Sequence, residues 1–87
     1  MADRRLTVSL VTPERTLFEG AADMVVAPAW DGEVGILPSH APMLVLLGRG
    51  ELRVRQGNLE ERFLVAGGFL EVAGDVVTVL SEHTEAA

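Results

Sequence analysis

The sequence predicts an all-β domain, an antiparallel sandwich or barrel of about 8–10 short strands. Three observations lead to this fold class. Apolar and polar residues alternate with period two through most of the chain, and Gly, Pro, Asn and Asp recur at short intervals between the alternating runs. In addition, no long stretch carries the apolar stripe of an amphipathic helix.

The first half of the chain contains five expected strands. Residues 6–11 alternate apolar residues with small hydroxyl residues, and Pro13 closes this run. The strands that follow are expected at residues 16–19, 23–27, 34–37 and 43–47. Pro28 should end the third strand, because proline cannot donate to a ladder. Asp31-Gly32 is a tight-turn signal, which predicts a hairpin between the third and fourth strands with its tip near Asp31.

Four more strands are expected in the second half of the chain. Residues 38–42 form a rigid, extended connection, since each of its two prolines fixes its own φ. Strands then follow at residues 51–55, 61–65, 69–72 and 76–80, with Gly67-Gly68 as a bend or bulge. The tail from residue 81 is compatible with a helix but too short to hold without packing. We therefore expect a single domain over residues 1–87, with a core at 5–82 and a frayed tail at 83–87.

Composition excludes several classes of function. The chain is 48% hydrophobic, which favours a folded core over disorder, and its formal net charge of −6 disfavours direct binding to nucleic acid or anionic lipid. It contains no cysteine, so disulfides and thiolate metal sites are excluded. Its apolar runs fall far short of the ~20 residues that cross a bilayer, so membrane association is expected to go through a partner.

The sequence offers no convincing catalytic constellation. Ser39 and His40 are adjacent, and an extended backbone points neighbouring side chains to opposite faces, which is poor geometry for a nucleophile and its base. A zinc site made of two histidines and a carboxylate is conceivable, but no spacing supports it. The side chains available to such sites are Asp23, Asp31, Glu33, Ser39, His40, Asp75 and His83. We expect no enzymatic activity, no cofactor and no metal.

The most informative motif lies in residues 31–44, which read DGEVGILPSHAPML. This segment resembles the signature of the epsilon subunit of F-type ATP synthases, an acidic-Gly-Glu-aliphatic-Gly-aliphatic hairpin that leads into Pro-x-His-Ala-Pro. Further matches occur at Thr12-Pro13-Glu14, at residues 17–20 and at residues 63–80, in the same order. The resemblance covers the chain from about residue 5 to residue 82.

The resemblance implies a flattened sandwich of two antiparallel sheets and a role as a non-catalytic rotor subunit in the central stalk. Such a subunit couples the gamma subunit to the membrane ring of a proton- or sodium-translocating synthase, peripherally on the cytoplasmic face of the cell membrane. It implies ring contacts through Trp30, Asp31 and Glu33. It also implies gamma contacts through Ser39, His40, Ala41 and Pro42.

Each of these residues also has a structural interpretation. Glu33 could be a solvated turn residue, and His40 could cap a backbone carbonyl in its loop. Trp30 departs from the family, which usually has a small or polar residue there. It could anchor the ring interface, where tryptophan is enriched among hot spots, or cap the edge of the sandwich.

The resemblance also marks a difference at the end of the chain. Epsilon subunits commonly continue into a C-terminal helical hairpin that can inhibit ATP hydrolysis and, in some members, binds ATP. This chain stops at Ala87, where the hairpin would begin, so inhibition and nucleotide binding through it are expected to be absent. Two other hypotheses remain open: a small β-sandwich module with Trp30 lining a ligand pocket or protein-binding surface, and, behind it, a metalloenzyme.

Overall fold

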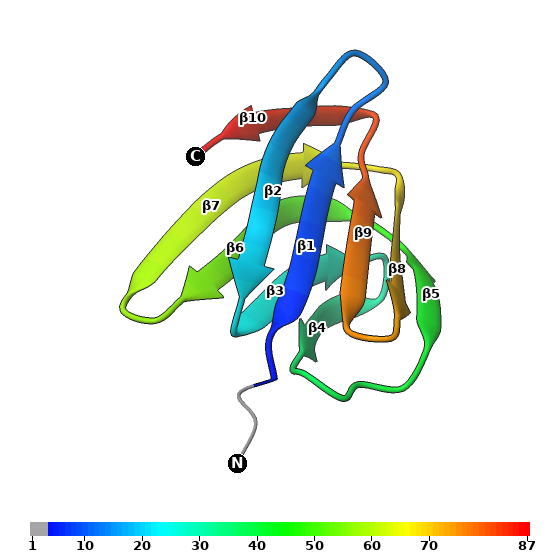
Figure 1. Cartoon of the computed structure of the whole chain (residues 1–87). Coiled ribbons are helices and arrows are strands. Elements are labelled where there is room, and N and C mark those ends of the chain that lie inside the picture. Colours follow the sequence, from blue (N-terminus) through cyan, green and yellow to red (C-terminus); the bar gives the residue numbers. More distant parts are fainter. Residues whose placement is uncertain (1–3) are drawn as a thin grey trace.

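The computed structural model describes residues 4–87, which form two five-stranded sheets packed face to face (Figure 1). The described residues contain no helix, so the predicted all-β sandwich is confirmed. The strands are β1 (Leu6–Val11), β2 (Thr16–Ala22), β3 (Met24–Ala29), β4 (Gly32–Ile36), β5 (Met43–Leu46), β6 (Arg49–Gln56), β7 (Leu59–Ala66), β8 (Phe69–Ala73), β9 (Val76–Leu80) and β10 (His83–Ala86).

Each sheet mixes strands from both halves of the chain. Sheet A has the order β2-β1-β9-β8-β5, and sheet B has the order β10-β7-β6-β3-β4. All described neighbours are antiparallel except β1 and β9, which run parallel from Thr7↔Val76 to Val11↔Leu80. This parallel pair departs from the expected antiparallel arrangement. It arises because the β1–β2 and β8–β9 hairpins join edge to edge through strands of the same direction.

The core lies between the two sheets and is built by the period-two alternation. In β1 the side chains of Leu6, Val8 and Leu10 are fully buried, while those between them face outward. Phe18 and Phe63 meet edge to face across the sandwich, with ring centroids 6.1 Å apart. The other fully buried large side chains are Val25, Ile36, Leu52, Val54, Val65, Leu70, Val72, Val77 and Val79. Burial of apolar area of this kind is the main stabilising contribution to the fold.

Strand β3 is longer than the sequence predicted, because it continues through Pro28 to Ala29. Pairing with β6 stops at Val26↔Arg53, whereas pairing with β4 continues to Ala29↔Gly32. Beyond Val26 the strand therefore has one ladder partner, and a proline without an N–H is tolerated there. The Pro28 carbonyl still accepts a hydrogen bond from the Gly48 N–H at 2.8 Å.

The expectation of a frayed or helical tail was wrong for residues 83–86, which form β10 on the edge of sheet B. The strand pairs with β7 from His83↔Ala66 to Ala86↔Phe63. Ser81, which is fully buried, fixes the entry to β10: its hydroxyl lies 3.2 Å from the Gly67 carbonyl and 2.9 Å from the His83 carbonyl. Tertiary pairing along an open sheet edge thus overrides the weak local preference of the tail.

Candidate functional site

The residues predicted to face the ring lie at and beside the tip of the β3–β4 hairpin. Ala29 and Gly32 form the last pair, so Trp30 and Asp31 are the two loop residues and both are exposed. Gly32 has φ 131°, a backbone conformation that residues with a Cβ rarely adopt. The Trp30 N–H donates to the Leu46 carbonyl in β5 at 3.0 Å. This bond ties the tip, which belongs to sheet B, to the edge of sheet A.

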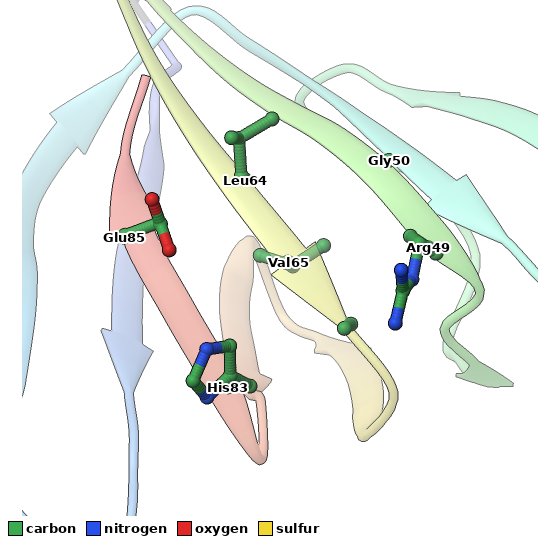
Figure 2. Close-up of a pocket in the computed structure, with 7 residues that line it drawn as sticks. Arg49, Gly50, Leu64, Val65, His83 and Glu85 are labelled. Atoms are coloured by element: carbon green, nitrogen blue, oxygen red, sulfur yellow. The ribbon is translucent and has the colours of Figure 1, made fainter.

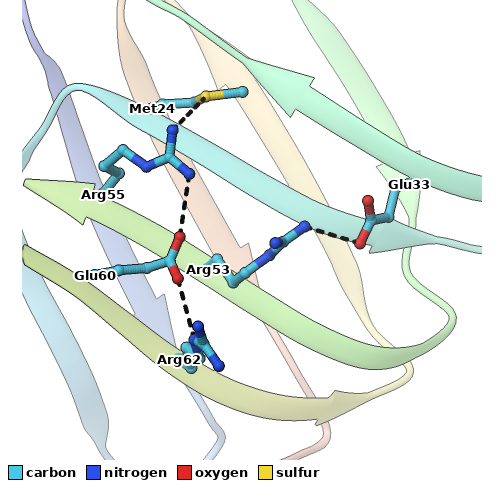
Figure 3. Close-up of polar contacts among 6 residues, drawn as sticks. All are labelled: Met24, Glu33, Arg53, Arg55, Glu60 and Arg62. Carbon is cyan, nitrogen blue, oxygen red and sulfur yellow. Dashed lines mark hydrogen bonds and ion pairs between the residues drawn. The ribbon is translucent and has the colours of Figure 1, made fainter.

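Glu33 takes part in an ion pair that the sequence did not predict (Figure 3). Arg53 of β6 donates through Nη2 to Glu33 Oε2 at 3.1 Å, reaching across β3. The Glu33 side chain nevertheless remains 61% exposed, whereas that of Arg53 is 30% exposed. Glu33 is therefore held in place from one side and open to solvent on the other.

A second charged group lies next to this pair on the outer face of sheet B (Figure 3). Glu60 accepts hydrogen bonds from Arg55 Nη2 at 3.3 Å and from Arg62 Nε at 3.1 Å. These two guanidinium groups, Arg55 foremost, lower the pKa of the Glu60 carboxyl below its ordinary value. Arg53, Arg55 and Arg62 are thus engaged with carboxylates of the same sheet.

An apolar surface accompanies the hairpin tip, and we call Trp30, Leu44, Leu46 and Phe69 the apolar edge surface. Their exposed fractions are 70%, 70%, 63% and 39%. Leu46 lies opposite Phe69 in the β5–β8 ladder, and Leu44 points to the same outer face two residues earlier. Trp30 is joined to this row by its backbone bond to Leu46.

The residues predicted to face gamma lie in the connection from β4 to β5. Ser39, Ala41 and Pro42 are exposed, and His40 is half-buried. His40 Nδ1 lies 2.8 Å from the Ala41 carbonyl, which can only accept, so Nδ1–H is the donor. His40 therefore caps a backbone carbonyl of its own loop, as the structural interpretation expected. Ser39 and His40 form no nucleophile–base pair with each other among the hydrogen bonds of the described residues.

The structure does not bring the two predicted sets together. The hairpin tip precedes the five-residue strand β4 and the Ser39–Pro42 segment follows it, so they lie at opposite ends of that strand. At about 3.3 Å per residue, β4 separates them by roughly 13 Å. The domain thus offers two distinct candidate surfaces rather than one composite site.

Two shallow cavities lie away from these surfaces. One, of about 370 Å³, is lined by residues of β6, β7 and β10, including Arg49, Leu64 and His83 (Figure 2). Another, of about 400 Å³, lies between the β1–β2 turn and β10. Trp30 lines neither of them. Within residues 4–87, no three His, Asp or Glu side chains are grouped to hold a metal ion, and no helix could cross a membrane.

Comparison with known proteins gives the family. The model of the "ATP synthase, Delta/Epsilon chain, beta-sandwich domain" matches residues 5–87. The chain belongs to this family. The ATP synthase epsilon chain of Brevibacillus brevis is 44% identical over 82 residues, which cover 93% of this chain and 62% of the relative. That of Acidithiobacillus ferridurans is 49% identical over 82 residues, covering 94% of this chain and 58% of the relative.

Solved structures agree with this delta/epsilon sandwich fold. A chain in the OSCP/F1/c-ring structure of the Euglena gracilis mitochondrial ATP synthase superposes with a TM-score of 0.90 at 19% identity. A chain in the central stalk/c-ring structure of the Tetrahymena thermophila mitochondrial ATP synthase gives 0.77, also at 19% identity. This chain is covered to 99% in both, and it spans 56% and 69% of those chains.

Sequence reasoning missed the apolar edge surface of this epsilon-type sandwich, although a signal was present. Residues 43–47 read MLVLL, an unbroken apolar run. A strand with one solvated face should alternate apolar and polar residues, whereas an unbroken run is typical of a strand covered on both faces. In the structure Leu44 and Leu46 lie on the outer face of β5 and are exposed to solvent.

Proposed function

We propose that this domain is a non-catalytic rotor part of an F-type ATP synthase that joins the gamma subunit to the membrane ring. The observation that carries the proposal, beside the family match, is the apolar edge surface. Four large apolar side chains, each 39–70% exposed, gather along β5, β8 and the hairpin tip. Contiguous exposed apolar residues of this kind mark protein–protein contacts.

The gamma contact is proposed for the Ser39–Pro42 segment and the outer face of β5. Pro42 leads directly into Met43, the first residue of β5, so the segment is continuous in the chain with exposed Leu44 and Leu46. A partner that covers both would bury leucine side chains in its centre and leave the polar loop at its rim. That distribution is the ordinary anatomy of a protein interface.

The ring contact is proposed for the hairpin tip, through Trp30, Asp31 and Glu33. An arginine on the polar loops of the ring can approach the open side of Glu33, because Arg53 already contacts Oε2 from within the sheet. An exposed pair contributes only ~0–1 kcal/mol, but it sets orientation, and the exposed Trp30 indole supplies apolar area beside it. The coupling ion, proton or sodium, follows from the ring and not from this domain. Under this proposal the domain lies on the cytoplasmic face and reaches the membrane through the complex.

The test is a pull-down of wild type and Glu33→Arg against purified gamma subunit assembled with its rotor ring. Wild type is expected to capture both partners, and Glu33→Arg is expected to keep gamma but lose the ring. Glu61→Arg, a charge reversal at another exposed carboxylate on β7, is the matched control and should behave as wild type. Ring capture by Glu33→Arg would move the ring contact elsewhere on the tip. Failure of wild type to capture either partner would overturn the proposal.

The other candidate function is a small β-sandwich binding module with Trp30 at a ligand site. The 70% exposure of Trp30 makes its fluorescence a direct reporter of anything that covers it. A small molecule that changes this emission, while gamma and ring leave it unchanged, would favour the module.

A further inference from the structure

The connection between β4 and β5 contains a turn that is strained in its present sequence. The His40 N–H donates to the Leu37 carbonyl at 3.2 Å, which makes Pro38 and Ser39 the two central residues of a β-turn. Ser39 has φ 70°. Proline followed by a residue of positive φ is the pattern of a type II turn, in which glycine is usual at the second central position. A serine there needs an interaction that holds it.

That interaction comes from Asp75, in the turn that joins β8 to β9 of sheet A. Its Oδ1 accepts the Ser39 N–H at 2.6 Å. Its Oδ2 accepts Arg4 Nε at 3.1 Å and Nη2 at 2.6 Å. The Asp75 side chain is 16% exposed, so the carboxylate sits largely between its two partners. The Ser39 N–H, and next Arg4, lower the pKa of this carboxyl below its ordinary value, so it is ionised at neutral pH.

Asp75 is itself held rigidly. It is the second residue of the two-residue loop that joins β8 to β9, and both loop residues have positive φ, 58° for Gly74 and 63° for Asp75. This is the type I′ geometry that matches the twist of paired strands. Its carbonyl also accepts the Thr7 N–H at 2.8 Å, which fixes the loop to β1. Figure 1 shows the β8–β9 turn and the β4–β5 connection at the same end of the sandwich.

We propose that Asp75 is a positioning residue that sets the conformation of Ser39–Pro42 for binding to the gamma subunit. It acts through the Ser39 N–H and touches no partner itself. The inference rests on the proposed function for the gamma contact. It adds that the contact segment takes its shape from a carboxylate of the β8–β9 turn, 36 residues further along the chain.

The experiment compares Asp75→Gly, Asp75→Gly with Ser39→Gly, and Arg4→Gln in the 87-residue chain. Glycine keeps the positive φ of the β8–β9 turn available and removes the carboxylate. The Ser39 amide should then exchange with solvent roughly tenfold faster or more, since a hydrogen bond to a charged acceptor is lost. Amides of β1 and β9 should be unchanged, which shows that the variant is folded.

Binding to purified gamma subunit should weaken by a similar factor in Asp75→Gly. Adding Ser39→Gly should restore most of it, because glycine adopts φ 70° without help. A role in general stability alone would not give this rescue. Arg4→Gln removes the ion pair but keeps the Ser39 contact, so it should bind gamma as wild type does. Asp75→Asn, which keeps an oxygen acceptor and tolerates positive φ, should lie between.

The outcomes separate this inference from the proposed function. Unchanged exchange of the Ser39 amide in Asp75→Gly would overturn the positioning role whatever gamma does. Faster exchange with undiminished gamma binding would also overturn it, since the segment's shape would then not matter to the partner. Wild type that fails to bind gamma would refute the proposed contact itself.

Discussion

Replacing Gly68 by alanine is expected to destabilise the sandwich strongly. Gly67 and Gly68 carry the chain from β7 in sheet B to β8 in sheet A, and the Gly68 carbonyl accepts the Leu47 N–H at 2.9 Å. A Cβ on Gly68 would lie 2.0 Å from the Leu80 carbonyl oxygen and 2.8 Å from Ser81 Cα. Both are backbone atoms of the strand β9 and its exit, so neither can rotate away.

Two contributions give the loss of unfolding free energy expected for Gly68→Ala. Gly68 has φ 105°, and a residue with a Cβ in such a region costs about 1–3 kcal/mol. Moving the Leu80 oxygen from 2.0 Å to a tolerable distance above 3.0 Å means a backbone shift, for which overpacking costs of about 1–3 kcal/mol are typical. The sum is about 2–6 kcal/mol. A domain of this size has only about 4–13 kcal/mol of unfolding free energy.

Urea unfolding at equilibrium measures this loss, with Gly57→Ala as the matched control. Gly57 also has positive φ, 61°, but a Cβ there would meet nothing within 4 Å. The control should lose only the strain of the left-handed conformation, about 1–2 kcal/mol. With a urea dependence near 1.5 kcal/mol per M, a 3 kcal/mol loss lowers the midpoint by about 2 M. Equal losses in the two variants would refute the steric argument.

Two further predictions concern acid stability and the outer face. The Gly57 N–H, and then Arg5, lower the folded-state pKa of Asp23. Arg55 and Arg62 lower that of Glu60. The Ser39 N–H, and then Arg4, lower that of Asp75. The contribution of these carboxylates is present above the unfolded carboxyl pKa values and lost as pH falls through the lowered ones. The urea midpoint should therefore stay level down to about pH 5 and fall below about pH 4, and a rise there would contradict the assignment. Leu70→Ala, in the fully buried core, should lower the unfolding free energy by about 2–5 kcal/mol. Leu44→Ala, at a side chain that is 70% exposed, should change it by no more than about 0.5 kcal/mol and yet weaken gamma capture. A large stability loss in Leu44→Ala would mean that this side chain is packed within the domain.

Local signals in the sequence predicted the hairpins well. The tip predicted near Asp31 lies where the chain reverses between β3 and β4, and Gly57-Asn58 and Gly74-Asp75 are the loop residues of two further hairpins. Such turns depend on φ values that few residues adopt, so their residues are visible in sequence. Pairing between strands that are far apart in the sequence has no comparable local signal. The parallel pairing of β1 with β9, and the addition of β10 to the edge of β7, depend on which edges are free after the sheets form.

In the candidate site, too, the local turn could be predicted from the sequence and the contacts between distant residues could not. The sequence placed a hairpin tip near Asp31, and the structure confirms the hairpin, with Trp30 and Asp31 as its two loop residues. It did not predict that Glu33 pairs with Arg53, because β3 separates their two strands in the sheet. Nor did it predict that Asp75 reaches Ser39, since the bond joins two turns that lie 36 residues apart in the chain. Side-chain contacts of this range depend on the order of the strands in the sheets, which period-two alternation leaves undetermined.

The two candidate surfaces are joined by hydrogen-bonded strands rather than by flexible loops, and this has a mechanical consequence for the proposed role. Residues 37–42 are the longest connection between described strands, and the Ser39 and His40 N–H groups both pin it. At the other end of β4 and β5, Trp30 is bonded to Leu46. A force applied at the hairpin tip is therefore carried to the Ser39–Pro42 segment by paired strands. A domain that only bound a ligand at one tip would have no need of a pinned connection at the far end, whereas a coupling element held at both surfaces would slip without it.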